Sequence, residues 1–158
     1  MIRCVIKPSV AFISIKATEI IEKQIPIDAE RLNRIKEGLA KHGMVIEQSA
    51  EWDERLISKG YEALTFSDGT IVAHTKASAS GIFEELIHYG QIKRGGTIID
   101  DEKNNILMEI EAKERLIKYK KAYRITESEI ETLTDGLEYY KIKLKGILRG
   151  STDVSNDN

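Results

Sequence analysis

The tightest constraint on the fold is a turn signal, Asp68-Gly69, which separates two apolar runs at residues 61–66 and 70–75. Asp-Gly between apolar runs is a strong signal for a hairpin, because glycine readily adopts the positive φ angle that a tight turn between antiparallel strands needs. The sequence therefore predicts a β-hairpin in the middle of the chain. A short segment of small residues, 77–80, then leads into an expected helix that ends near Gly95-Gly96.

Two helices are expected before the hairpin. The first begins at Pro26 and Asp28 and is closed by Gly43, and Ser49 caps the second, which stops at Gly60. Side-chain oxygens of Asp and Ser accept hydrogen bonds from the first N–H groups of a helix, and glycine commonly ends one. The strands predicted from β-branched runs outside the hairpin are residues 4–15 and 44–46.

Two further helices are expected after a polar connection at residues 97–105. One covers residues 106–119, and the other begins at Thr126, where Thr126 and Glu129 form a capping box. Apolar residues recur along this last helix at spacings of three and four, which predicts a buried stripe of Ile130, Leu133, Leu137, Tyr140 and Leu144. Helices around a hairpin place the chain in the α+β class.

Length and charge exclude several classes of protein. A chain of 158 residues fits one domain, so we expect a single domain at residues 1–150 and a disordered tail at 151–158. Lys and Arg total 24 against 26 Asp and Glu, so no net charge draws the chain to nucleic acid or to an anionic membrane.

The N-terminal apolar run is interrupted by Lys7, Pro8 and Lys16, so neither a membrane span nor a secretory signal is expected and a cytoplasmic location is favoured. The single cysteine, Cys4, excludes an internal disulfide and any cysteine-based metal site. We expect it to be a buried structural thiol. The chain has three histidines, which shortens the list of metal ligands: His42, His74 and His88.

The helix after the hairpin carries the residues that point to chemistry. Glu84 and His88 are four residues apart, so their side chains project into the same space one turn apart. A helix offers two ligands to one metal ion in this way, with the residue after the first ligand, here Glu85, placed as a base. The alternative is a solvated helix face with an ordinary Glu–His pair.

A third ligand is available on the next expected helix, where residues 109–112 read Glu-Ile-Glu-Ala. Glu109 is the candidate and Glu111 the reserve, and both also fit an ordinary charged helix. The hairpin that feeds the helix of Glu84 would provide an edge strand, which can hold an extended peptide by β-augmentation.

Residues 83–91 and 109–117, supported by 61–65, resemble a known family. The stretch from Arg31 to Leu148 is similar to the zincin-like metallopeptidase toxin domains at the C-termini of bacterial polymorphic toxins and of some phage head-morphogenesis proteins. The resemblance implies a zincin-like fold, in which a small sheet with a hairpin edge feeds a metal-site helix and two further helices follow. It also implies peptide-bond hydrolysis, a peptide or protein substrate, a cognate immunity protein and delivery within a larger effector.

The resemblance makes Glu84, His88 and Glu109 ligands of Zn²⁺ and Glu85 the catalytic base. Zincins usually carry histidine where this chain has Glu84. Two carboxylates make the site neutral around Zn²⁺, so it polarises water less and shifts preference toward harder ions such as Mn²⁺. Groups that could stabilise the oxyanion are His74, Tyr139 and Tyr140.

Two other functions stay open. One is a non-catalytic binding domain, a phage-associated protein that kept the fold without the metal. The other is a nuclease-type toxin that uses the basic segment 113–124, in which Tyr119 and Tyr123 are interleaved with Lys and Arg. A solvated helix face also explains that segment, so nucleic acid is a less favoured partner than peptide.

Overall fold

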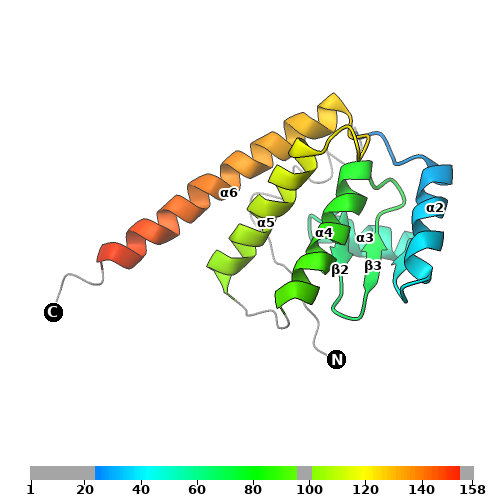
Figure 1. Ribbon diagram of the computed structural model, residues 1–158, viewed down its shortest axis with the longest axis horizontal. Helices are drawn as coiled ribbons and strands as arrows, with labels where there is room; N and C mark the ends of the chain where they lie inside the picture. The colour runs from blue at the N-terminus through cyan, green and yellow to red at the C-terminus, as the bar shows by residue number, and fades with distance from the viewer. Residues whose placement is uncertain (1–23, 96–100, 154–158) are drawn as a thin grey trace. The chain divides into compact units, whose positions relative to one another are not determined.

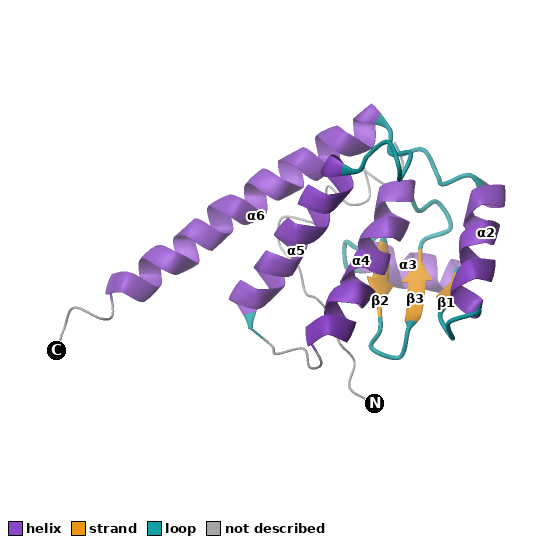
Figure 2. Cartoon of the chain, in the orientation of Figure 1, coloured by secondary structure: helices purple, strands orange, loops and turns teal. Residues whose placement is uncertain are grey.

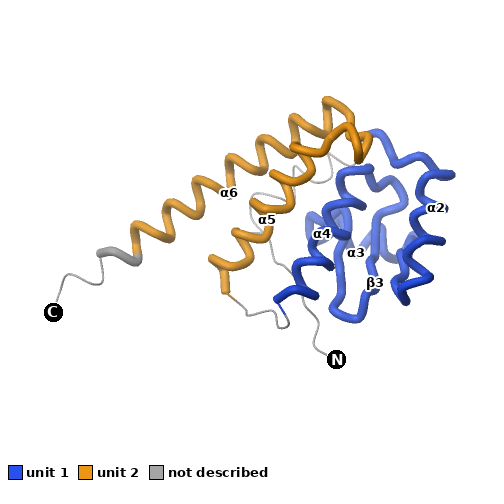
Figure 3. The backbone as a smooth tube through the Cα atoms, in the orientation of Figure 1, with its two compact units in different colours: residues 1–96 blue, residues 97–158 orange. Residues whose placement is uncertain are grey.

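The computed structural model describes residues 24–95 and 101–153, with side chains as far as Gly150. The chain divides between residues 96 and 97 into two compact units, each described here by itself (Figure 3). The described residues form five helices and one three-stranded sheet, which confirms the α+β class. The strand expected at residues 4–15 and the thiol of Cys4 lie outside the described residues.

The described residues of the first unit form three helices and the sheet (Figure 1). Its elements are α2 (Ala29–Ala40), β1 (Val45–Glu47), α3 (Ala50–Ser58), β2 (Ala63–Thr65), β3 (Thr70–Ala73) and α4 (Ala79–Gly95). Asp28 caps α2 by accepting from the backbone N–H of Arg31 at 2.9 Å, and Ser49 caps α3 by accepting from that of Trp52 at 3.2 Å. Both expected caps are therefore confirmed.

The sheet has the order β1-β3-β2, so β3 lies in the centre (Figure 2). β2 and β3 are antiparallel, with Leu64 opposite Val72, and Gly69 has a φ angle of 93° in the turn between them. The predicted hairpin is confirmed. β1 runs parallel to β3, with Ile46 opposite Ile71. Parallel neighbours need a crossover connection, and here α3 and β2 lie within it.

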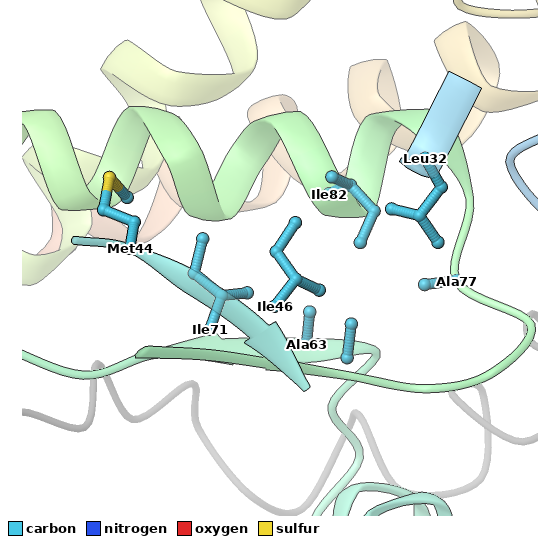
Figure 4. Close-up of a cluster of buried hydrophobic side chains, with 8 residues drawn as sticks. Leu32, Met44, Ile46, Ala63, Ile71, Ala77 and Ile82 are labelled. Atoms are coloured by element: carbon cyan, nitrogen blue, oxygen red, sulfur yellow. The ribbon is translucent and has the colours of Figure 1, made fainter. Parts of the chain in front are cut away.

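A cluster of buried side chains holds α2 and α4 against the sheet (Figure 4). Its members are Leu32, Met44, Ile46, Ala63, Ile71, Ala73, Ala77 and Ile82. Neighbouring residues of a strand point to opposite faces, and Ile71, Val72 and Ala73 are all 0% exposed. The central strand is therefore covered on both faces, and Ile82 anchors the first turn of α4 in the core.

In the second unit, residues 101–153 are described and form two helices, α5 (Glu102–Lys118) and α6 (Glu127–Asp153). Ion pairs tie them together, from Lys141 to Glu114 at 2.7 Å and from Lys143 to Glu102 at 2.8 Å. The prediction of a non-helical connection up to residue 105 is wrong, because α5 already begins at Glu102. Asp101 caps it by accepting from the N–H of Lys103 at 3.0 Å.

The capping box at the start of α6 is confirmed. The backbone N–H of Thr126 donates to Glu129 Oε2 at 2.7 Å, and that of Glu129 donates to Thr126 Oγ1 at 3.2 Å. The predicted stripe is confirmed as well: Leu133 and Tyr140 are buried, and Ile130, Leu137 and Leu144 are half-buried.

α6 continues to Asp153, past the expected start of the tail at residue 151. Compact units of this size can belong to one domain, so the single-domain organisation stays a prediction. None of the described helices has both the length and the apolar character needed to cross a bilayer.

Candidate metal centre

The start of α4 is fixed by the carboxylate of Glu62, the residue directly before β2. Glu62 Oε1 accepts a hydrogen bond from the backbone N–H of Ser78, and Ser78 Oγ accepts from the N–H of Gly81 at 3.1 Å. A Cβ atom at position 81 would lie 2.5 Å from Glu62 Cδ. Only glycine fits there without a shift, so the Glu62 side chain determines how the first turn of α4 approaches β2.

The polar face of α4 carries two buried side chains. Ile87, on the apolar side of the helix, is 7% exposed, and on the polar side His88 is only 3% exposed and Gln91 only 7%. The interpretation of this face as an ordinary solvated surface is therefore wrong for His88 and Gln91. A helix with covered side chains on both of its sides places its titratable groups where water screens them least.

His88 is held in one orientation by its own helix. Its Nδ1 atom lies 2.8 Å from Gln91 Oε1, and a carbonyl oxygen can only accept, so the ring proton is on Nδ1. The lone pair of the neutral ring is then on Nε2, the form in which histidine binds metal. Glu84 and His88 each offer a donor atom, and these two atoms lie within 4.8 Å of each other.

Glu85 points toward β2. The Thr65 hydroxyl lies 2.7 Å from Glu85 Oε2 and 2.9 Å from the backbone oxygen of Glu85. β2 is the edge strand of the described sheet, as expected. Ala63 and Thr65 in this strand are only 5% and 6% exposed.

Glu62 was missed by the sequence analysis. Burial of its carboxyl group raises the pKa of Glu62 above its usual value of 4.5, and the negative charge of Glu84 adds to the rise. Hydrogen bonds from Ser78 and Gln24 act in the opposite direction. In the sequence, Glu62 is one glutamate among many, and the available signal is its place directly before a buried strand.

The second unit holds the other expected ligand. Glu109 lies on α5 and accepts from Lys113 Nζ at 3.2 Å, with the two side chains 12% and 11% exposed. Glu111, the reserve ligand, is exposed on the same helix. As residue types, Glu84, His88 and Glu109 can each offer one donor atom to a metal ion.

The expected oxyanion groups lie in other surroundings. His74 Nδ1 accepts from the N–H of Lys76 at 2.9 Å, and its Nε2 is 3.9 Å from Asp53 Oδ2 of α3. Tyr139 and Tyr140, on α6, make an edge-to-face ring contact at 5.2 Å. Within the first unit, Glu84, Glu85 and His88 thus share one helix, while His74 belongs to a hydrogen-bonded loop next to α3. Their catalytic roles stay predictions.

Comparison of the chain with protein-family models, with curated proteins and with solved structures gave no match.

Proposed function

We propose that the chain is a metal-dependent peptidase of the zincin-like toxin type, with Glu84, His88 and Glu109 as ligands and Glu85 as base. The observation that carries the proposal is the pair on α4. A buried histidine whose Nδ1 is held by Gln91 lies one turn from a carboxylate, with the two donor atoms within 4.8 Å. Histidines that bind metal commonly have their second nitrogen held in this way.

The donor chemistry fits a divalent ion. One imidazole and two carboxylates suit Zn²⁺, and the carboxylate share also suits Mn²⁺. When bound, such an ion would supply a Lewis acid that polarises the peptide carbonyl and makes water more acidic. Glu109 is preferred to Glu111 as third ligand because its carboxylate is largely withdrawn from solvent, whereas Glu111 is exposed.

The residues of the chain would handle the proton. Glu85 accepts a proton from water as the water oxygen bonds to the carbonyl carbon. Glu85 then passes this proton to the amide nitrogen as the C–N bond breaks, which releases a carboxylic acid and an amine. The Thr65 hydroxyl, 2.7 Å from Glu85 Oε2, holds the carboxylate in one rotamer between these two transfers.

Metal analysis of the purified chain tests the proposal. We expect about one equivalent of zinc or manganese, lost in Glu84→Ala, His88→Ala and Glu109→Ala. Glu111→Ala is the matched control on the same helix and should keep the metal. Glu85→Gln should also keep it while losing peptidase activity by a factor of about 10² or more. A wild-type chain that binds no divalent ion would refute the assignment.

A second candidate is the non-catalytic binding domain, and one observation favours it. Glu109 already has a cationic partner in Lys113, at the i,i+4 spacing that stabilises helices without any metal. A folded wild-type chain without metal affinity would support this function.

The nuclease alternative is disfavoured because basic side chains of the segment 113–124 already have partners within the chain. Lys120 pairs with Glu127 at 3.1 Å, and Arg115 donates to the Tyr123 hydroxyl at 3.3 Å. Salt-sensitive nucleic-acid binding that is lost on changing Lys118, Lys120 and Lys121 would revive it. If the chain is such a toxin, we propose that it is made in the cytoplasm and that a cognate immunity protein binds it.

A further inference from the structure

The Lys113 side chain lies between α5 and α6, in a space that the neighbouring residues leave open for it. Its ammonium group lies 3.2 Å from Glu109 Oε2 and 5.5 Å from the ring centroid of Tyr140. A Cβ atom at position 136 would come within 3.0 Å of Lys113 Cε and 3.4 Å of its Cδ. Gly136 therefore leaves the space through which the lysine stem passes.

This arrangement differs from an ordinary surface pair. Glycine inside a helix destabilises it by about 1 kcal/mol relative to alanine, and here it occurs where the lysine needs room. The Lys113 side chain is 11% exposed, while Lys118, farther along α5, is exposed. The charge of Lys113 is consequently less screened by water than that of a surface lysine, so it acts more strongly on its surroundings.

We propose that Lys113 sets the net charge of the metal site, and this inference rests on the proposed function. With Glu84 in place of a histidine, two carboxylates cancel the charge of a divalent ion. The ammonium group beside Glu109 returns one positive charge, so the site regains the charge of a divalent ion held by two histidines and one glutamate. Lys113 thereby offsets the electrostatic consequence of Glu84.

A charge role and a positioning role predict opposite results for metal affinity. A positive charge beside a cation site repels the cation, so removing that charge should tighten metal binding. If Lys113 only orients Glu109, removing it should loosen metal binding, because the carboxylate loses its support. The sign of the change therefore distinguishes the two roles.

The experiment measures Zn²⁺ and Mn²⁺ affinity of the full chain by competition with a chelator. Lys113→Gln keeps a hydrogen-bond donor toward Glu109 and removes the charge, and Lys113→Met removes both. We expect both variants to bind each ion at least tenfold more tightly than the wild type. Lys113→Arg should stay within about threefold of the wild type, and so should Lys118→Met, the control on the exposed side of α5.

The outcomes separate this inference from the proposed function. A wild-type chain that binds no metal refutes the proposed function, and the role of Lys113 falls with it. A wild-type chain that binds metal, with unchanged or weaker binding in Lys113→Gln, overturns the charge role alone. Thermal unfolding of each variant shows that the affinities are compared between folded proteins.

Discussion

Gln91 Oε1 accepts a hydrogen bond from His88 Nδ1 at 2.8 Å, three residues farther along the same helix, and both side chains are buried. This bond defines the tautomer of His88. It also means that the carboxamide of Gln91 controls the direction of the second ring nitrogen.

Removing this bond should weaken metal binding. Gln91→Leu leaves the Nδ1 proton without its acceptor, so the ring can rotate or change tautomer. We expect the metal affinity to fall by about 10- to 100-fold, measured by chelator competition. Gln91→Glu retains an acceptor and should bind the metal at least as tightly as the wild type. Equal affinities in Gln91→Leu and the wild type would show that the bond does not orient a ligand.

Gly81→Ala should destabilise the chain. The new methyl group would lie 2.5 Å from Glu62 Cδ, and overpacking of this kind typically costs about 1–3 kcal/mol. Gly90→Ala is the matched control in the same helix, because its methyl group would meet only Arg94 Nη1 at 3.7 Å and alanine favours helices. Urea unfolding should therefore rank Gly90→Ala at or above the wild type and Gly81→Ala below it.

The clash at position 81 should be relieved by shortening Glu62. In the double variant Gly81→Ala with Glu62→Ala, the loss of stability should be smaller than the sum of the two single losses. Strictly additive losses would mean that the two side chains do not meet.

The stability of the chain should depend on the ionisation of Glu62. Its pKa is raised in the folded state, chiefly by burial. The protonated form therefore stabilises the fold, and this contribution is complete below pH 4.5 and is lost as the pH rises through the raised pKa. Relative to Glu62→Gln, the metal-free wild type should lose stability as the pH rises from 4.5 toward neutrality. Urea unfolding in the presence of a chelator measures the difference, and a gain of wild-type stability over that range would contradict the assignment.

Thr65→Val should lower stability by about 1–3 kcal/mol, because the half-buried carboxylate of Glu85 loses a hydrogen-bond donor. Thr65→Ser keeps the hydroxyl and should retain most of the stability. Thermal unfolding of the two variants gives the comparison. Equal losses in both would assign the effect to the missing methyl group instead of the hydrogen bond.

The parts of the fold that the sequence predicted are those set by interactions between residues close together in the chain. The caps at Asp28, Ser49 and Thr126 and the Asp68-Gly69 turn depend on residues within a few positions of one another, and all are confirmed. The start of α5 was missed because its cap, Asp101, lies in a polar segment without an apolar period.

The predictable part of the site was likewise local. The spacing of Glu84 and His88 fixes a common face of α4, and the structure places their donor atoms within 4.8 Å of each other. The spacing did not predict that His88 is buried, and the approach of Glu62 to Gly81 joins residues that lie far apart in the sequence. No local sequence pattern predicted the parallel pairing of β1 with β3 either.

The central position of β3 has a consequence for how the first unit is made. Both other described strands take their hydrogen-bonding partners from β3, yet both precede it in the chain. Neither can complete its pairing during synthesis until the residues around Ile71 have left the ribosome, and contacts between distant segments form slowly. α4 follows β3 directly, so the helix that bears Glu84 and His88 emerges just as the surface that receives it is assembled.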